Sequence, residues 1–570
     1  MGRKPFIVVV LAALVVTTAA SAAHSARRAD TVVSSTTTEL MPGVTYTREV
    51  ELTAAGPVVL DIVTAPKPDG TVYSLAPVLS NGTLVHTAKL TRMEQGLYPH
   101  ATTVGLDGDY FDAGGEPNSI LMRRGLLDSQ PKTGRTSAGF STDGTLQAAQ
   151  VAFSGTWQAT AGQRQLALNS RRGHFTLFTR AYGHSTPLEP DTVAEAVFSS
   201  FPPTAVGEDI VGTVSQMTSV GGTPIPPGGA VLVARGTDNA TKLQTEAGVG
   251  QQVTVHLTLT PDWSGLASAI GGGPVLVKDG KAVFVNGETF RPGFLQSRMA
   301  RGAVGQLADG RILLVTVEAA APAYSVGIST YSLALELVKL GAVTAVGLGS
   351  GPQAGMAFNG SLLTRPASGT EQSISDALVL SYTGVYASPV APVLSPNGDG
   401  AGDTETLTYR LVRPATVTAT LHGPNGAIVP IESGGPEAVG VHTFVWDGTL
   451  ASVPQPEAAW TFSVTATDDR AIETTAERTF SLDKTLGSLT VFSNSSGGET
   501  ARFVLSRQAD VVVRVLRPNG YAVATFHLPH LAPGPHRVPW KGTTAGKYVM
   551  RVDATSTIGT SSLVAPFVLK

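Results

Sequence analysis

The chain contains no cysteine, which excludes disulfide bonds, thiolate metal sites and a cysteine nucleophile. Charged residues are also scarce, at 15% of the 570 positions, and 40 basic residues are nearly balanced by 43 acidic ones. The resulting net charge of −3 provides no basic surplus of the kind that binds nucleic acid or an anionic membrane. We therefore expect no nucleic-acid partner.

Long apolar runs are absent after the first residues of the chain. The run Phe6–Val16 has 11 residues, follows Arg3 and Lys4, and precedes a segment of small residues. A membrane-spanning helix needs about 20 apolar residues, so this order predicts a secretory signal peptide over residues 1–26, with an uncleaved anchor as the alternative. Without a later transmembrane segment, the mature chain is expected to be secreted, extracellular or held at the cell surface.

Aromatic residues make up only 6% of the chain, whereas glycine and proline are abundant, with 63 and 37 copies. This composition favours many short strands joined by turns. One helix is clear, because Leu333, Leu337 and Leu340 share one face of the segment 331–340. Thr330 is placed to cap its start and Gly341 to cap its end.

Two segments near the end of the chain repeat one pattern. The landmarks Gly426, His442 and Gly448 recur with one spacing as Gly520, His536 and Gly542. Alternating apolar residues around Pro-Asn-Gly turns are typical of small antiparallel sandwiches. The two units resemble bacterial Ig-like domains of the flagellar hook-capping type, and we expect them at residues 390–484 and 485–570.

A candidate calcium loop opens the first of these units. Asn397, Asp399 and Asp403 offer oxygen ligands of the type that Ca²⁺ prefers. The loop lacks the bidentate glutamate of an EF-hand, and an Asx turn satisfied by its own backbone is the interpretation we favour. Apart from this structural calcium no cofactor is expected, because the H-E-x-x-H and G-x-S-x-G motifs are both absent.

Several local sequences in the first two-thirds of the chain follow one another in a recognisable order. They are Val104–Asp112 with Gly114–Pro117, Leu166–Arg172, Ile270–Gly280, Arg301–Gly305 with Asp309–Val315, and the capped helix ending at Leu340 and Gly341. Together they resemble the phosphodiester glycosidase family, which includes the lysosomal uncovering enzyme and bacterial exopolysaccharide-associated proteins. The resemblance covers residues 30–388. It implies an α+β catalytic-type domain, strand-rich with few helices, ahead of two all-β Ig-like sandwiches.

The resemblance also implies a reaction and a set of catalytic groups. Cleavage of a glycosyl phosphodiester passes through a sugar cation, so carboxylates are needed beside the anomeric carbon and donors around the phosphate. Asp107, Asp109 and Glu318 are the candidate catalytic residues. Asp107 and Glu318 depart from the family pattern, which has Asn and Asp at these positions.

Four further residues are candidates for substrate binding: Arg301, Asn169, Gln353 and Gly349. The guanidinium of Arg301 is suited to a phosphate oxygen. Gly349 stands where the family has Asp, and Gln353 where it has Ser. A glycine offers no base, nucleophile or electrostatic partner, so Gly349 is the most serious departure.

Two functions remain open at this point. The first is a secreted phosphodiester glycosidase that hydrolyses a sugar-1-phosphodiester in a surface or extracellular glycan, with the C-terminal units attaching it to a cell wall or polysaccharide. The second is a catalytically degenerate relative that binds glycans or the cell envelope. Both have a carbohydrate or sugar-phosphate polymer as partner, and only the site distinguishes them.

Overall fold

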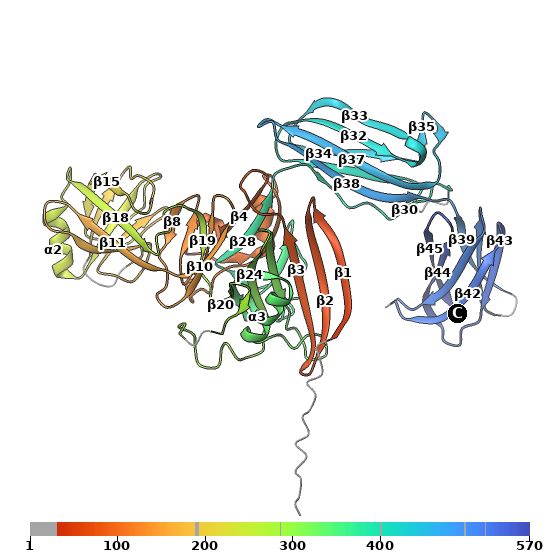
Figure 1. The fold of residues 1–570 in the computed structure, drawn as a ribbon, viewed down its shortest axis with the longest axis horizontal. Coiled ribbons are helices and arrows are strands. Elements are labelled where there is room, and N and C mark those ends of the chain that lie inside the picture. The colour runs from red at the N-terminus through yellow and green to blue at the C-terminus, as the bar shows by residue number, and fades with distance from the viewer. Residues whose placement is uncertain are drawn as a thin grey trace, which may run out of the picture.

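The computed structural model describes residues 31–188, 193–284, 287–398, 402–494, 497–518 and 520–569, so the predicted signal peptide at 1–26 lies outside the described residues. Strands account for 54% of the described residues and helices for 7%. Figure 1 shows strands in every part of the coloured ribbon and few, short helices. None of the helices in these ranges is long and apolar enough to cross a membrane.

The predicted fold class, an α+β catalytic-type domain followed by two Ig-like sandwiches, is wrong. Within the described ranges the α-helices are α1 (Leu90–Leu97), α2 (Thr237–Glu246) and α3 (Thr330–Lys339). Helices of two or three turns each cover one small face, so strands make the cores and the chain is nearly all β throughout. The α3 signal in the sequence is real but isolated. The predicted domain boundaries stay a prediction.

The helix α3 begins one residue earlier than the sequence indicates. The hydroxyl of Ser329, rather than that of Thr330, accepts the N–H of Ser332 and caps the helix. Leu333 and Leu337 are buried as expected, and Gly341 follows the helix with a φ of 90°.

An eight-stranded sheet forms one layer of the N-terminal part. Its order is β1 (Thr31–Met41), β2 (Val44–Thr53), β3 (Gly56–Ala65), β23 (Ile312–Val317), β22 (Arg301–Leu307), β24 (Ala342–Ser350), β20 (Val275–Lys278) and β21 (Lys281–Ala282). The helix α3 covers one of its faces, with Leu333 and Leu337 packed against a cluster that includes Val315 and Ala345. All pairings in this sheet are antiparallel.

A five-stranded sheet packs against the other face and carries the residues of interest. Its order is β26 (Ser361–Leu362), β25 (Met356–Phe358), β6 (Thr102–Asp107), β28 (Asp376–Tyr382) and β4 (Tyr73–Leu79). The strand β6 is central, and all six of its residues are buried. The short strands β5 (Ala88–Lys89) and β27 (Ser373–Ile374) pair beside it.

A second five-stranded sheet links this region to a separate core. Its order is β10 (Leu146–Gln150), β9 (Thr136–Ser141), β19 (Leu266–Ile270), β7 (Leu121–Arg123) and β8 (Leu126–Ser129). The eight strands beyond it are β15 (Asp209–Thr213), β18 (Gln252–Thr260), β11 (Ala152–Gln158), β12 (Arg164–Leu168), β13 (Phe175–Thr179), β17 (Ala230–Arg235), β14 (Val193–Phe198) and β16 (Gln216–Thr218).

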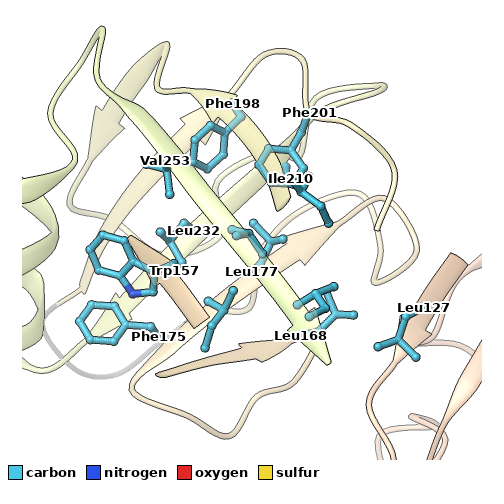
Figure 2. Close-up of a cluster of buried hydrophobic side chains, with 14 of the residues drawn as sticks. Leu127, Trp157, Leu168, Phe175, Leu177, Phe198, Phe201, Ile210, Leu232 and Val253 are labelled. Carbon is cyan, nitrogen blue, oxygen red and sulfur yellow. The ribbon is translucent and has the colours of Figure 1, made fainter. Parts of the chain in front are cut away.

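The eight strands enclose their own hydrophobic core, which Figure 2 shows in close-up. Trp157 lies at its centre with no exposed surface, and its ring stands edge-on to Phe175 at 5.1 Å between centroids. Leu177, Leu232 and Val253 project into the same core from three further strands. This part of the fold therefore holds the loops around residues 128–133 and 169–173 in place independently of the β6 sheet.

The C-terminal strands form two units of two sheets each. In the first unit, one sheet has the order β29 (Tyr386–Ala387), β31 (Glu405–Leu411) and β34 (Gly440–Trp446). Its other sheet has the order β30 (Val393–Leu394), β38 (Glu473–Leu482), β37 (Ala458–Asp468), β32 (Ala415–His422) and β33 (Ile428–Glu437). The short strands β35 (Thr449–Leu450) and β36 (Val453–Pro454) form an additional hairpin. The second contains β39 (Leu486–Ser493), β40 (Glu499–Leu505) and β43 (Gly534–Trp540) in one sheet and β42 (Ala522–Leu531), β41 (Ala509–Leu516), β44 (Gly546–Thr555) and β45 (Thr560–Leu569) in the other.

The repeat predicted from the sequence recurs as equivalent strand pairings. Glu405 pairs with Trp446 in the first unit, and Glu499 pairs with Trp540 in the second. The first unit is also tied to the N-terminal part, since the buried Arg410 donates to the carbonyl of Ala101 at 3.2 Å, directly before β6. The assignment of these units to the hook-capping type has no support beyond the sequence pattern.

We predict that Trp157 stabilises the fold through the volume that its ring fills in the core and not through its indole N–H. Trp157→Ala should lower the free energy of unfolding by about 3–5 kcal/mol, because it opens a large cavity. Trp157→Phe should cost clearly less, since it also removes an indole N–H that has no hydrogen-bond partner in the described structure. Denaturant unfolding of both variants tests this, and equal losses would contradict it.

Candidate functional site

The candidate site lies where β6 ends beside β24 and β28. Asp107 is the last residue of β6 and faces Ala377 of β28 in the antiparallel register. One residue further, the carbonyl of Gly108 accepts the N–H of Gly349, at the end of β24, at 2.8 Å. The two sheets of the N-terminal part are thereby joined at their strand ends, and Asp107 is only 2% exposed there.

Three glycines make room for two carboxyl groups at this junction. A Cβ atom on Gly349 would lie 2.1 Å from Oδ2 of Asp107, and one on Gly302 would lie 2.9 Å from Oδ1. A Cβ atom on Gly271, in the Gly-Gly-Gly-Pro turn, would lie 2.3 Å from Oδ2 of Asp109. Gly349 thus does not leave the site without a carboxyl group, because Asp107 occupies the space beside it.

Each of the two aspartates has one oxygen engaged and one without a partner. Oδ1 of Asp107 accepts the N–H of Gly355 at 3.3 Å, and Oδ1 of Asp109 accepts the N–H of Tyr110 at 2.8 Å. Neither Oδ2 atom makes a hydrogen bond to the described residues. The N–H of Ser119 is nevertheless near enough to Asp109 to lower the pKa of that carboxyl somewhat.

A third aspartate, Asp376, holds the backbone of Asp109 in place. Asp376, at the start of β28, accepts the N–H of Asp109 at 2.7 Å through Oδ1 and the hydroxyl of Ser375 at 2.7 Å through Oδ2. It has no exposed surface. Oδ1 of Asp376 therefore holds the turn between Asp107 and Asp109, while its Oδ2 is occupied by the neighbouring Ser375.

Burial raises the pKa of all three carboxyl groups, because a charged carboxylate is poorly solvated inside the protein. Desolvation raises the pKa of Asp107 to about 8. Desolvation and then the charge of Asp376 raise the pKa of Asp109 to about 8, against the opposing effect of Arg135. Desolvation raises the pKa of Asp376 to about 6. Carboxyl groups that exchange protons near neutral pH are suited to acid–base chemistry.

Asp107 and Asp109 border a cavity of about 140 Å³, which we call the carboxyl cavity. Its other lining residues are Tyr110, Phe111, Gly349, Ser350, Gln353 and Ile374. The hydroxyl of Tyr110 lies 3.3 Å from that of Ser350. The structure therefore brings together four of the residues proposed from the sequence: Asp107, Asp109, Gly349 and Gln353.

The loop that carries Phe290 and Phe294, which we call the aromatic loop, packs against Tyr110. The rings of Phe290 and Phe294 stack on each other at 5.5 Å, and both stand edge-on to Tyr110 at 5.8 Å. The guanidinium of Arg135 lies over Phe290 at 4.1 Å and over Tyr110 at 4.7 Å. A buried cation is thereby held close to Asp109 without a salt bridge to it.

Arg301, proposed as a phosphate ligand, is engaged with backbone carbonyls. Its Nε donates to Ile328 at 2.9 Å, and its Nη2 donates to Phe294 at 2.7 Å and to Ser297 at 2.8 Å. The residue is 2% exposed. In this arrangement Arg301 holds the aromatic loop and acts on the carboxyl cavity through Phe294 and Tyr110.

Glu318, proposed as a catalytic carboxylate, belongs to a different cluster. Its Oε1 lies 3.1 Å from Nη1 of Arg48 and accepts the N–H of Arg365 at 3.0 Å. Arg48 also pairs with the fully buried Asp61 at 3.2 Å. Desolvation and the charge of Glu318 raise the pKa of Asp61 to about 8. Glu318 does not line the carboxyl cavity.

Asn169, proposed as a substrate ligand, lines a second cavity of about 300 Å³. Its Nδ2 donates to the carbonyl of Asp128 at 2.8 Å and to the hydroxyl of Thr179 at 2.9 Å. Its Oδ1 accepts the N–H of Thr179 at 2.8 Å. These bonds hold the residue at a φ of 47°, so the side chain of Asn169 shapes the wall of this cavity.

The candidate calcium loop is only partly described. Asp399 lies outside the described residues, while Oδ1 of Asp403 accepts the N–H groups of Asn397 at 2.9 Å and Gly398 at 2.7 Å. Both bonds run from Asp403 to N–H groups five and six residues earlier, so this carboxylate closes the loop, whereas an Asx turn accepts the N–H two residues further along. The Asx turn stays a prediction. Within the described ranges there is no group of three or more histidine or carboxylate side chains arranged for a metal ion.

Sequence reasoning missed the parts of the site that depend on pairing between distant strands. Tyr110 and Ser350 lie 240 positions apart and meet only because β6 and β24 end together. The support of Asp109 by Asp376, 267 positions away, requires the β6–β28 register. Gly271 appears in the sequence as an ordinary turn residue.

Comparison with known proteins supports a family relationship over part of the chain. Residues 203–381 match the family model described as phosphodiester glycosidase. This segment contains Arg301, Glu318, Gly349 and Gln353, whereas Asp107, Asp109 and Asn169 precede it. No curated protein matches the sequence.

Three solved structures are similar to the chain. A hypothetical protein from Synechocystis has a TM-score of 0.52 and 22% identity over 61% of this chain and 64% of its own, which shows a shared fold. A Burkholderia pseudomallei protein described as exported has a TM-score of 0.46 and 19% identity over 57% of this chain and 74% of its own. The catalytic domain of zebrafish N-acetylglucosamine-1-phosphodiester alpha-N-acetylglucosaminidase has a TM-score of 0.33 and 13% identity over 60% of this chain and 84% of its own. The chain thus spans less than two-thirds of the Synechocystis protein.

We predict that Gly349 cannot carry a side chain while Asp107 is present. Gly349→Ala should lower the free energy of unfolding by about 1–3 kcal/mol, because its Cβ would overlap the buried carboxyl group. Gly265→Ala is the matched control, since nothing lies within 4 Å of a Cβ at that position. Adding Asp107→Gly should restore much of the loss, and a double-mutant cycle by thermal unfolding measures this coupling. Additive effects would refute the contact.

We predict a pH-dependent contribution of Asp107 to stability. Its carboxyl has a pKa of about 8 in the folded chain and an ordinary pKa of 3.8, so between these values the folded state binds a proton that the unfolded state has lost. Stability therefore falls as pH rises through this range. Asp107→Asn removes this loss, so its Tm relative to the native chain should increase from pH 5 to about pH 8 and then level off.

The exposed Asp143 provides the control for this titration. Hydrogen bonds from Ser141, Lys67 and Thr145 lower its pKa, so Asp143→Asn should show no such gain at high pH. Calorimetry of the three proteins across the range makes the comparison. Parallel pH profiles for Asp107→Asn and the native chain would show that Asp107 is not protonated in the folded state.

Proposed function

We propose that the protein hydrolyses a sugar-1-phosphodiester in a surface or extracellular glycan. The observation that carries this proposal is the pair Asp107 and Asp109, two buried carboxyl groups that border one cavity and each keep an unpartnered oxygen. The family match over residues 203–381 supplies the reaction class. Gly349, Ser350 and Gln353 of the matched segment line the same cavity as the two aspartates.

The reaction needs both a proton acceptor and a group that stabilises positive charge. Water adds to the anomeric carbon while the bond from that carbon to the phosphate oxygen breaks, and its electron pair stays with the phosphate. The proton lost by water passes to a carboxylate, and the developing sugar cation is stabilised by a neighbouring carboxylate. A phosphate monoester leaves readily, so it needs less help from an acid than an alcohol does.

The raised pKa values suit a pair in which one carboxyl group donates a proton and the other accepts one. Because the pKa values of Asp107 and Asp109 are both about 8, the pair carries one proton around that pH and can then serve as donor and acceptor together. Gln353 is half-buried and, among the described residues, its amide has no hydrogen-bond partner, so it is available to a sugar hydroxyl or phosphate oxygen. Tyr110 adds a hydroxyl and a ring face for the sugar.

The position of Asp107 also weighs against the non-catalytic alternative. That alternative rests on the departures at Gly349, Gln353 and Gln372. At the first of them a Cβ would meet Oδ2 of Asp107 at 2.1 Å. A carboxyl group is therefore available in that space, supplied by β6 instead of β24. Secretion and attachment of the enzyme to a cell wall or polysaccharide through the C-terminal units belong to the same proposal and rest on the sequence.

We predict that hydrolysis depends on the aspartate pair and not on Glu318. Sugar release from a panel of glycosyl-1-phosphodiesters should fall about 100-fold or more in kcat for Asp107→Asn and for Asp109→Asn, because each removes a group that exchanges protons in the reaction. Glu318→Gln is the matched carboxyl control. It should keep kcat within about tenfold, since Glu318 pairs with Arg48 away from the carboxyl cavity.

Thermal unfolding of each variant separates loss of catalysis from loss of folding. Unchanged kcat in both aspartate variants would refute the site. A loss in Glu318→Gln as large as in Asp109→Asn, with folding intact, would move the catalytic group to the Arg48 cluster. Absence of sugar release by the folded native chain across the whole panel would refute the proposed activity.

A further inference from the structure

The second cavity, of about 300 Å³, lies next to the carboxyl cavity and plays no part in the chemistry described above. We call it the Lys132 cavity. Three stretches of chain enclose it: the turn after β6 at residues 112–118, the segment 129–133, and the segment 169–172. Its charged lining residues are Asp112, Glu116, Lys132, Arg171 and Arg172.

The acidic residues of this cavity are already engaged. Oδ1 of Asp112 accepts the N–H groups of Gly114 at 2.8 Å and Glu116 at 3.1 Å. Oε1 of Glu116 lies 2.7 Å from Nε of Arg171 and accepts the hydroxyl of Tyr182 at 3.2 Å. Asp112 therefore stabilises its own turn, and Glu116 neutralises Arg171.

The other two cations are left without a counter-charge. Neither Lys132 nor Arg172 has a carboxylate within 4.0 Å among the described residues, and their side chains make no hydrogen bond there. Desolvation, and then repulsion by Arg135 and Arg172, lower the pKa of Lys132, while Asp109 opposes this. Because Glu116 pairs with Arg171, Lys132 and Arg172 outweigh the remaining carboxylate, Asp112, and the lining carries a net positive charge that favours an anion.

The buried Ser119 connects the wall of the Lys132 cavity to Asp109, although it lines neither cavity. The hydroxyl of Ser119 accepts the N–H of Lys132 at 2.9 Å, and a Cβ on Gly271 would touch both Asp109 and Ser119. The Lys132 cavity also shares Gln130 and Arg172 with an open groove of about 540 Å³ that runs past Arg164 and His174. The Lys132 cavity thus adjoins a groove whose volume is sufficient for further sugar residues.

We infer that the Lys132 cavity binds the oxyanion groups, phosphate or carboxylate, of an acidic glycan chain. Resting on the proposed function, this makes the substrate a polyanion, with sugar residues beyond the scissile bond held by Lys132 and Arg172. Their ammonium and guanidinium groups donate charge-assisted hydrogen bonds to these oxyanions. The cavity has room for a sugar residue together with its acidic group.

The test measures binding to the full chain, so it does not depend on turnover. The probes are a decamer of galacturonic acid, a decamer of mannose linked through phosphodiesters, and neutral maltodecaose. The phosphodiester decamer is used in the Asp109→Asn background to prevent cleavage. Lys132→Gln/Arg172→Gln is compared with Lys278→Gln/Lys281→Gln, which removes two exposed charges from the β20–β21 hairpin outside the cavity.

At least one acidic decamer should bind the native chain, and the cavity variant should weaken that binding by about tenfold or more. The hairpin variant should stay within about twofold, and raising the salt to about 0.15 M should weaken native binding. The decamer that loses affinity identifies phosphate or carboxylate as the recognised group. Equal effects in the two variants, or equal binding of maltodecaose, would overturn the inference.

The outcome is separable from that of the proposed function. Acidic-glycan binding that the cavity variant abolishes, in a native chain that releases no sugar from any phosphodiester, would leave the Lys132 cavity in place and refute the hydrolase. Hydrolysis with unchanged KM and unchanged affinity in the cavity variant would support the hydrolase and refute the Lys132 cavity as part of its site.

Discussion

Burial of uncompensated carboxyl groups at the end of β6 is the constraint on which the candidate site depends. Asp107 and Asp109 are almost fully enclosed, yet neither forms a salt bridge with an arginine or lysine of the described structure. Such groups are tolerated inside a protein when they take up a proton and when backbone N–H groups hold them. Gly271, Gly302 and Gly349 provide the space, and Asp376 fixes the turn between the two aspartates.

The cations around the site are arranged so that they do not neutralise this pair. Arg135 is held between aromatic rings, and Arg301 donates to backbone carbonyls of the aromatic loop. Lys132 faces the neighbouring cavity. Positive charge is therefore present on the side where an anionic substrate would lie, while the carboxyl groups keep the raised pKa values that acid–base chemistry requires.

Two departures from the family pattern meet at one place in the structure. The sequence shows Asp107 in place of Asn and Gly349 in place of Asp as two separate changes. In the structure the two positions are neighbours, since a Cβ atom on Gly349 would lie 2.1 Å from Oδ2 of Asp107. A carboxyl group therefore lies beside position 349, and it comes from the end of β6.

The sequence by itself was sufficient for features set by local pattern. These include the abundance of strands, the position of α3, the repeat that places Trp446 and Trp540 in equivalent pairings, and the choice of Asp107 and Asp109 as candidate residues. Short-range periodicity, capping and motif order carry this information because they involve residues near one another in the chain. The α+β class failed because one strong helix signal says little about how the remaining strands share the core.

Only the tertiary structure decided which candidates act together. Glu318 joins a cluster with Arg48 of β2 and Asp61 of β3. The side chain of Asn169 bonds to Asp128 and Thr179, and that of Arg301 donates to backbone carbonyls, two of them in the aromatic loop. The outcome for Glu318 depends on pairing between strands that lie some 270 positions apart in the chain, whereas Asn169 and Arg301 find their partners within 41 positions. In strands, a shift of register by one position reverses the face of every side chain. The sequence named the chemical groups, and the pairing of distant strands selected the two that share a cavity.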